Sequence, residues 1–205
     1  MKYLLILLTL ITANFSFGQD IKKMPKYFGD SYRIDSANSI IIPIQYNSDL
    51  FSKWSFESYY ADLILFNYKE NKQKRIFNEN TYIKPFIDRS YYYNRENEKL
   101  KIPNISQRSI FLFVKNIDFD NNNKINDTDP FVLYVCDLQG NNLKAITPIS
   151  ENAVSFELYE SLNFILIRMQ RDYNKDSQFT YKDKDFYYLK VDLEKFEVIT
   201  KIELE

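Results

Sequence analysis

The stretch FLFVKNIDFDNNNKINDTDPFVLYVCDLQGNNLKAIT, residues 111–147, decides the fold of this chain. Apolar runs at 110–116 and 131–138 flank a polar loop at 118–129, and a shorter strand at 143–147 follows a turn. Short runs of β-branched and aromatic residues between Asn- and Asp-rich turns are typical of strands. The stretch therefore predicts an antiparallel meander with an acidic loop between its first two strands.

The same order of elements returns as ILIRMQRDYNKDSQFTYKDKDFYYLKVDLEKFEVIT at 165–200, where Asp172 lies 54 positions after Asp118. Each copy runs strand, acidic loop, strand, Asp-Leu, turn, strand. Such a period indicates a repeat architecture, although any two β-meanders share part of this order. A weaker third copy, without the acidic pattern, has a strand at 39–46, a loop at 47–58 and strands at 61–68 and 74–77. The second of its strands is predicted to begin at residue 59. Further strands are predicted at 153–158, 164–170, 186–193 and 196–204.

The segment LYVCDLQGNNLKAITP, residues 133–148, resembles the blade signature of TolB-type β-propeller repeats. That signature is an apolar strand ending in Asp-Leu, a Gly turn and a strand ending in Leu-Thr. The likeness is good over 109–148, fair over 163–202, where Glu194 and Lys195 replace the Gly turn, and poor elsewhere. It implies propeller-like blades that display, bind or scaffold, and it does not imply an enzyme.

The fold class that we expect is all-β, with antiparallel meanders that form about three blades. Three blades cannot form an ordinary closed ring of about four to eight. The alternatives are therefore an open or incomplete ring, a ring completed by a partner, and a different small β fold with blade-like meanders.

Both acidic loops resemble the EF-hand or dockerin type of calcium loop. Calcium takes about six to eight oxygen ligands, and such a loop supplies them from its positions 1, 3, 5, 7, 9 and 12. The candidate ligands of the first loop are Asp118, Asp120, Asn122, the carbonyl of Lys124, Asn126 and Asp129. Those of the second loop are Asp172, Asn174, Asp176, the carbonyl of Gln178, Thr180 and Asp183. The sequence predicts a structural Ca²⁺ in each loop, and a solvated Asx-rich turn without an ion is the alternative.

The loops depart from the usual calcium pattern in two ways. Position 6 is normally Gly, but here it is Asn123 or Ser177, and position 12 is Asp instead of the longer Glu. Their flanks are also predicted as strands and not as helices. Position 8 is apolar in both loops, as Ile125 and Phe179, so that each loop can attach to the core.

The composition excludes several classes of function. The chain of 205 residues has no His, which excludes Ser-His-Asp and Cys-His catalysis and the common zinc sites. Its three Gly exclude a Gly-rich phosphate loop, and we expect Asn and Asp to take the left-handed turn positions. Its 27 basic and 28 acidic side chains form no basic tract for nucleic acid. The single Cys136 lies in an apolar strand and is predicted to be a buried structural thiol.

The N-terminal residues 1–18 are predicted to be a signal peptide. Lys2 is the only charge before Asp20, an apolar run covers 3–11, and the small residues Ser16 and Gly18 precede a cut before Gln19. The apolar run is shorter than a membrane span of about 20 residues, and a retained N-terminal anchor is the alternative. We therefore expect a periplasmic or secreted protein with one β-repeat domain at 19–205 and no membrane span after cleavage.

The leading functional expectation is a non-enzymatic, calcium-stabilised protein of the cell envelope that binds or scaffolds an unidentified protein or glycan partner. A carbohydrate-binding module using Trp54, Phe56, Tyr59 and Tyr60 is the first alternative. A carboxylate-based glycoside hydrolase is the second, with the unassigned acids Glu57, Asp88, Glu157 and Glu160.

Overall fold

The computed structural model describes residues 26–46, 59–79, 81–86 and 104–204. These residues form an all-β fold of antiparallel strands, as the sequence predicts, with single 3-10 turns at Asp35–Ala37 and Glu160–Leu162. The predicted signal peptide and the loop at 47–58 lie outside the described residues. The strands are β1 (Lys26–Phe28), β2 (Tyr32–Ile34), β3 (Ser39–Tyr46), β4 (Tyr60–Asn67), β5 (Lys72–Arg75), β6 (Tyr82–Ile83), β7 (Ser109–Lys115), β8 (Val132–Asp137), β9 (Lys144–Ala145), β10 (Asn152–Tyr159), β11 (Phe164–Gln170), β12 (Phe186–Asp192) and β13 (Val198–Ile202).

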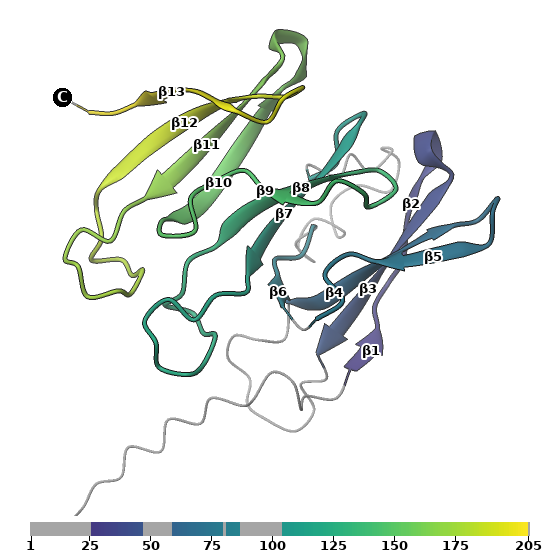
Figure 1. Cartoon of the computed structure of the whole chain (residues 1–205), viewed down its shortest axis with the longest axis horizontal. Helices are drawn as coiled ribbons and strands as arrows, with labels where there is room; N and C mark the ends of the chain where they lie inside the picture. Colours follow the sequence, from purple (N-terminus) through teal and green to yellow (C-terminus); the bar gives the residue numbers. More distant parts are fainter. Residues whose placement is uncertain (1–25, 47–58, 80, 87–103, 205) are drawn as a thin grey trace, which may run out of the picture.

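The strands form two sheets that contain three meanders. The larger sheet has the order β1-β3-β4-β6-β7-β8-β9, with β2 also paired to β3 and β5 to β4, and the smaller sheet runs β10-β11-β12-β13. We call β1–β5 the first meander, β6–β9 the second and β10–β13 the third. The pair Tyr60–Ile83 connects β4 to β6 and thus the first meander to the second. Figure 1 shows the three meanders side by side in an open row, with the second in the middle.

Most predicted strands agree with the structure to within one or two residues. Strands β3 and β11 match their predicted ranges, 39–46 and 164–170, at both ends. Strand β9 is shorter than the predicted 143–147, and β13 is shorter than 196–204. Strands β1, β2 and β6 were not predicted at their positions. Each has only two or three residues and shows no alternation of its own.

Two apolar cores separate the meanders. The first core lies between the first and second meanders, and the second core lies between the second and third. Strand β7 contributes to both, because Ile110, Leu112 and Val114 face the first core while Phe111 and Phe113 face the second. All seven of its residues are buried. A strand buried on both faces needs a continuous apolar run, which explains the sequence SIFLFVK.

Strand β11 shows the contrasting pattern of a strand at the end of the row. Its Ile165, Ile167 and Met169 are fully buried in the second core, as their alternation predicts. On its other face the guanidinium of Arg168 lies 4.3 Å from the ring centroid of Phe186. Long cationic side chains cover apolar surface while their charge stays in water. The outward positions of β11 are Phe164, Leu166 and Arg168, all half-buried. The third meander therefore ends the row with a face of mixed apolar and polar side chains.

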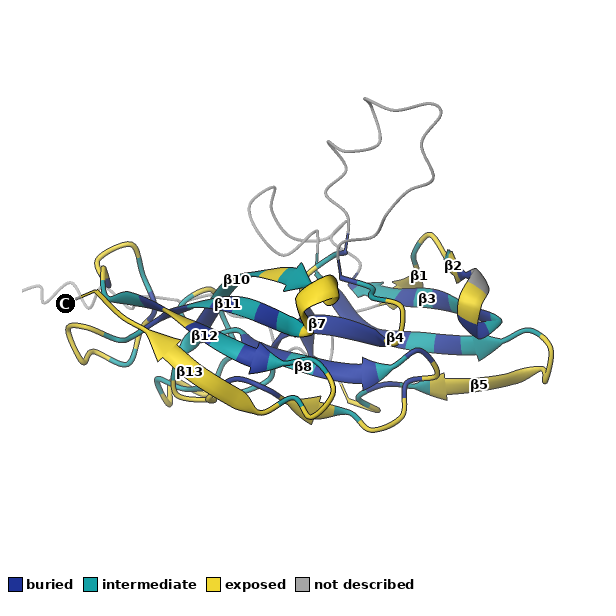
Figure 2. Cartoon of the chain, turned by 90° about the horizontal axis from the view of Figure 1, so that it is seen from above, coloured by how far each residue is buried: buried dark blue, intermediate teal, exposed yellow. Residues whose placement is uncertain are grey.

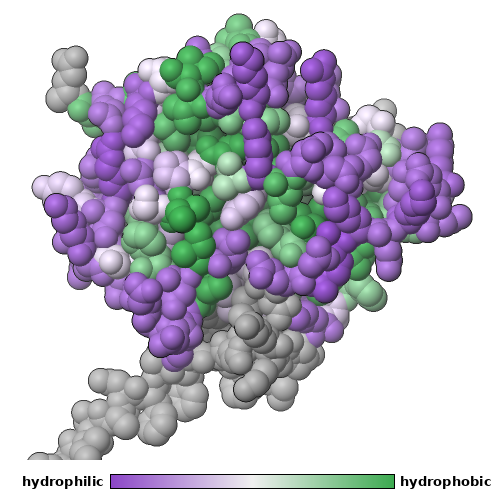
Figure 3. All heavy atoms as spheres, viewed as in Figure 1, coloured by the Kyte–Doolittle hydropathy of each residue, from purple (hydrophilic) through white to green (hydrophobic). Residues whose placement is uncertain are grey.

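Exposure differs sharply between inner and outer strands. Figure 2 shows buried residues along β4, β7, β8 and β11 and exposed residues along β5 and β13. The predicted alternation at 196–204 does not produce a buried face, since every residue of β13 is exposed. A register shift at Lys190/Val191 and the left-handed Phe196 interrupt the alternation there. Hydrophilic side chains cover most of the surface seen in Figure 3, with apolar side chains between them.

Asparagine takes most of the left-handed backbone positions of the described residues, as the shortage of glycine predicts, but no aspartate there takes one. The asparagines are Asn38, Asn71, Asn78, Asn121, Asn123, Asn142 and Asn163. The other left-handed residues are Lys175, Ser177, Phe196 and Gly140. Gly140 lies in the turn between β8 and β9, with φ of 77°. The Asp of the Asp-Leu pair stabilises this turn, because the Asp137 carboxylate accepts the N–H groups of Gln139 and Asn141. Asp192 accepts those of Glu194 and Lys195 in the same way.

Candidate metal centre

The first acidic loop connects β7 to β8 and is organised by two aspartates. Asp118 accepts the N–H groups of Asn122 and Asn123, at 3.0 and 2.7 Å. Asn123 has φ of 66°, so the residue at position 6 takes the left-handed conformation that Gly usually supplies. The carboxylate at position 1 therefore lies inside the loop, where the backbone wraps around it.

Asp129 closes the loop at position 12. It is only 1% exposed. Its two oxygens accept the N–H of Phe119 at 2.8 Å and the N–H of Asn126 at 2.7 Å. Burial raises the pKa of this carboxyl, against the backbone hydrogen bonds from Asn126 and Phe119, and the charge of Asp120 raises it further. The position-12 carboxylate is thus fixed in the interior of the loop.

The second acidic loop connects β11 to β12 and repeats these hydrogen bonds position by position. Asp172 accepts the N–H groups at positions 5 and 6, as Asp118 does. Asp183 accepts those of Tyr173 and Thr180, at positions 2 and 9, as Asp129 does. Ser177 at position 6 also takes a left-handed φ, of 62°. The two loops thus share one backbone design as well as one sequence pattern.

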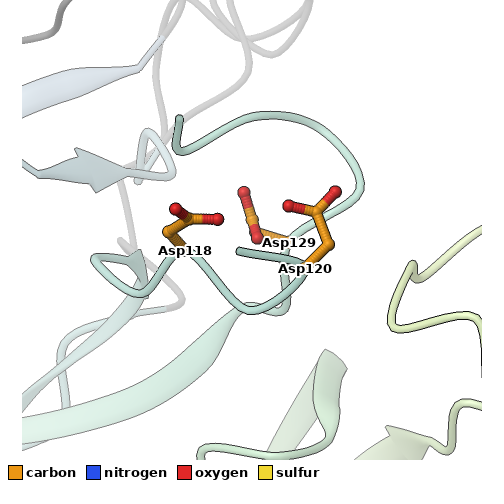
Figure 4. Close-up of side chains that lie close together, drawn as sticks. All are labelled: Asp118, Asp120 and Asp129. Atoms are coloured by element: carbon orange, nitrogen blue, oxygen red, sulfur yellow. The ribbon is translucent and has the colours of Figure 1, made fainter. Parts of the chain in front are cut away.

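The first loop brings three carboxylates together. One oxygen each of Asp118, Asp120 and Asp129 lies within 4.8 Å of the other two. Figure 4 shows the three side chains turned toward one another inside the loop. Calcium binds oxygens at about 2.3–2.6 Å, so two ligands of one ion lie at most about 5.2 Å apart. The geometry of the three aspartates fits one such ion.

The other predicted ligands of the first loop hold the loop and orient the three aspartates. The amide nitrogen of Asn122 donates to Asp120 at 2.7 Å, which orients that carboxylate. The side-chain oxygen of Asn126 accepts both the N–H and the hydroxyl of Thr128. Asn126 is therefore engaged in holding the loop, and Lys124 enters the predicted ligand set only through its backbone carbonyl.

The second loop gathers its acids less closely. Asp172, Asp176 and Asp183 do not form a group like that of the first loop, although all three are among the described residues. Positions 3 and 5 exchange roles, since the amide nitrogen of Asn174 donates to Asp176 at 2.8 Å. The remaining predicted ligands are Gln178, through its carbonyl, and Thr180, whose hydroxyl donates to Asp183 at 3.3 Å.

The position-12 carboxyls of the two loops have opposite pKa shifts. Burial pushes the pKa of Asp183 upward, but backbone hydrogen bonds from Thr180, Asn174 and Tyr173 outweigh it and hold the pKa below its usual range. The pKa of Asp129 is raised instead, partly by the neighbouring Asp120. Burial is the largest cause of the pKa shift at Asp129, whereas Asp183 accepts a third backbone hydrogen bond and the hydroxyl of Thr180, which together outweigh its burial.

A buried side chain anchors each loop, and neither anchor was predicted from the sequence. The amine of Lys115 donates to the carbonyls of Asn126 and Asp127, at 3.0 and 2.8 Å. Burial lowers the pKa of Lys115 to about 8, while Asp127 and Asp129 oppose this shift. The amide of Gln170 donates in the same way to the carbonyls of Thr180 and Asp183. The signal available in the sequence was a polar residue at the end of a largely apolar strand, Lys115 in SIFLFVK and Gln170 in FILIRMQ.

The apolar residue at position 8 attaches each loop to the preceding part of the chain. Ile125 packs against a small cluster of Tyr46, Ala61 and Tyr82, from β3, β4 and β6. Phe179 packs instead against the first loop, with its ring centroid 5.6 Å from that of Phe119. Each acidic loop thus rests on the repeat before it.

The residues proposed for sugar stacking lie partly in the core. Tyr60 is buried in the first core. Tyr59 packs against Tyr82 and Phe131, with ring centroids 6.0 and 5.9 Å away. Trp54 and Phe56 lie outside the described residues.

The unassigned acids are scattered. Glu157 is exposed and accepts the hydroxyl of Tyr159 at 2.7 Å. Glu160 lines a polar cleft of about 690 Å³ together with Glu194 and Arg108, at the end of β7 away from the acidic loops. Glu57 and Asp88 lie outside the described residues.

Comparison of the chain with protein-family models, with curated proteins and with solved structures gives no match. No helix among the described residues has the length and apolar character needed to cross a bilayer.

Proposed function

We propose that this chain is an exported, non-enzymatic β-repeat protein that binds calcium in its two acidic loops and serves as a binding or scaffolding element of the cell envelope. The observation that carries the proposal is the convergence of Asp118, Asp120 and Asp129 within 4.8 Å. The predicted signal peptide supports the envelope role.

A divalent cation would resolve an electrostatic conflict in the first loop. Two unit charges 4.8 Å apart repel by about 1 kcal/mol in water and by about 3.5 kcal/mol at an effective dielectric constant of about 20. The loop holds three carboxylates at such distances, and the amine of Lys115 bonds to backbone carbonyls and not to these carboxylates. Calcium supplies the positive charge and the demand for several oxygens that this cluster matches.

The role of the ion would be structural. Asp118 and Asp129 already hold the loop backbone through four N–H groups, so an ion bound to both would hold the two ends of the loop together. A ligand that binds only the folded state at 100 times its Kd stabilises that state by about 2.7 kcal/mol. With one cysteine the chain has no internal disulfide, and the ions would serve as its cross-links.

The test is calorimetric titration of the purified protein with Ca²⁺, beside the Asp118→Ala/Asp172→Ala double variant. We expect heat from two sites in the parent protein and none in the variant, with a rise in Tm on calcium addition only in the parent. Asp127→Ala is the matched control, because it removes a carboxylate from the same loop but not from the cluster of three.

Equal heats from the parent and the double variant would contradict the metal site. The protein for this titration is recovered from the envelope fraction or the medium of the producing cells. Its intact mass should correspond to a chain beginning at Gln19, and a mass that includes residues 1–18 would contradict the proposed export.

A further inference from the structure

Phe179, at position 8 of the second acidic loop, contacts the first acidic loop. Its N–H donates to the carbonyl of Thr128 in the first loop at 2.8 Å. Its ring packs on Phe119, with the two ring planes inclined by 44°. Phe179 is only 7% exposed, although it belongs to a polar loop. The contact therefore combines a backbone hydrogen bond with a buried aromatic pair.

Each end of this contact is one step from a position-12 carboxylate. In the first loop, Thr128 directly precedes Asp129, and the N–H of Phe119 donates to Asp129. In the second loop, Phe179 directly precedes Thr180, whose N–H and hydroxyl both donate to Asp183. A shift of either carboxylate on ion binding thus moves a residue that touches the other loop.

The two loops are supported unequally. The first loop rests through Ile125 on Tyr46, Ala61 and Tyr82, which belong to the strands of the first and second meanders. The position-8 residue of the second loop rests on the first loop itself. The first loop also has its acids gathered within 4.8 Å, whereas those of the second loop are not so gathered in the described structure. The second loop therefore depends on the first for part of its order.

We propose that the two loops bind divalent cations as a coupled pair, in which an ion in the first loop raises the affinity of the second through the contact of Phe179 with Phe119 and Thr128. This inference rests on the proposed calcium function. The coupling is reciprocal, because the free energy that links two binding sites is the same in both directions. Typical couplings change affinity by about 5- to 150-fold, and a contact of one hydrogen bond and one ring pair belongs near the lower end.

The coupling is measured by calcium calorimetry on the full chain and on variants with a single working loop. Asp172→Ala reports the first loop alone, and Asp118→Ala reports the second loop alone. We expect the product of the two association constants of the parent protein to exceed the product of the two single-loop constants at least fivefold. The same set of titrations is repeated in a Phe119→Ala background, which removes the ring pair and leaves every residue of the second loop in place.

We call the product of the two association constants of the two-loop protein, divided by the product of the two single-loop constants, the coupling ratio. In the Phe119→Ala background we expect the coupling ratio to fall to less than half of its parent value. The matched control is Tyr173→Ala. Tyr173 occupies position 2 of the second loop, as Phe119 does in the first, but its side chain is 70% exposed. Its removal should leave the coupling ratio unchanged.

The outcomes separate the two proposals. If the parent protein binds calcium at two sites but its coupling ratio is one, the coupling is overturned and the calcium function stands. A coupling ratio above five that survives in the Phe119→Ala background would overturn the assigned route through Phe179. A parent protein that takes up no calcium would overturn the proposed function itself.

Discussion

Replacing Gly140 by alanine should destabilise the protein by about 2 to 5 kcal/mol, and the structure divides this loss into two parts. Gly140 has φ of 77°, and an L-residue in the left-handed region costs about 1–2 kcal/mol. A Cβ atom there would lie 2.6 Å from Cδ1 of Ile76 and 3.0 Å from Cδ1 of Leu65. Both side chains belong to the first core, where overpacking costs about 1–3 kcal/mol.

The steric part can be removed separately. Ile76→Val deletes the Cδ1 atom in closest approach and costs about 0.5–1.5 kcal/mol by itself. In that background Gly140→Ala meets less resistance, while the backbone cost remains. The double variant should therefore be more stable, by about 1 kcal/mol, than the sum of the two single losses would predict.

The assay is urea unfolding followed by circular dichroism, with calcium held constant because bound ions add to stability. Gly29→Ala is the matched control. The three atoms nearest to its Cβ would all belong to the side chain of Gln45, the first at 2.7 Å, and Gly29 has no left-handed φ. Because the Gln45 side chain is half-buried and can rotate away, we expect a loss below about 1 kcal/mol. A loss for Gly140→Ala no larger than that of Gly29→Ala would refute the close approach of the turn to the first meander. Additivity with Ile76→Val would refute the assigned clash.

Two further predictions concern buried groups. Lys115→Met should lower the free energy of unfolding by about 1–3 kcal/mol in the absence of calcium, because the carbonyls of Asn126 and Asp127 lose their buried donor; unchanged stability in urea would contradict this. Burial, reinforced by the charge of Asp137, raises the pKa of Cys136 to about 12, whereas an unfolded cysteine has a pKa of about 8.5. The unfolded thiol therefore ionises first as the pH rises, and stability should fall above pH 8.5, by about 2 kcal/mol at pH 10. The test compares unfolding curves of the parent and of Cys136→Ala, and an equal pH slope in both would contradict it.

The sequence predicted those parts of the molecule that depend on local patterns. Alternation along 164–170 predicted which side of β11 is buried, since Ile165, Ile167 and Met169 all lie in the second core. The position of each aspartate predicted the loop turns, because short Asx side chains bond to N–H groups a few residues away. Whether the loops hold calcium remains a prediction.

The parts that the sequence could not predict depend on contacts distant along the chain. Strand β6 exists because Tyr82 and Ile83 pair with strands on both sides, and two residues carry no periodic signal. The anchor from Gln170 to Thr180 and Asp183 requires knowing how the loop folds back on its strand. Strand β13 lies at the edge of the smaller sheet and its pairing shifts register at Lys190/Val191, and no local pattern records either feature.

Position 8 connects the acidic loops with the repeat architecture. In an array of repeats, stability is approximately the sum of a term for each repeat and a term for each interface between neighbours. Ile125 and Phe179 place each loop on the interface with the preceding repeat, so the order of a loop belongs to the interface term. The first and second meanders share a large core, which stabilises their interface without much contribution from a loop. The second and third meanders belong to separate sheets, and the hydrogen bond from Phe179 to Thr128 is a backbone link between them. A second backbone link, from the N–H of Ala153 to the carbonyl of Phe131, lies close by. On the proposed function, ions in the loops would therefore stabilise the junction between the two sheets.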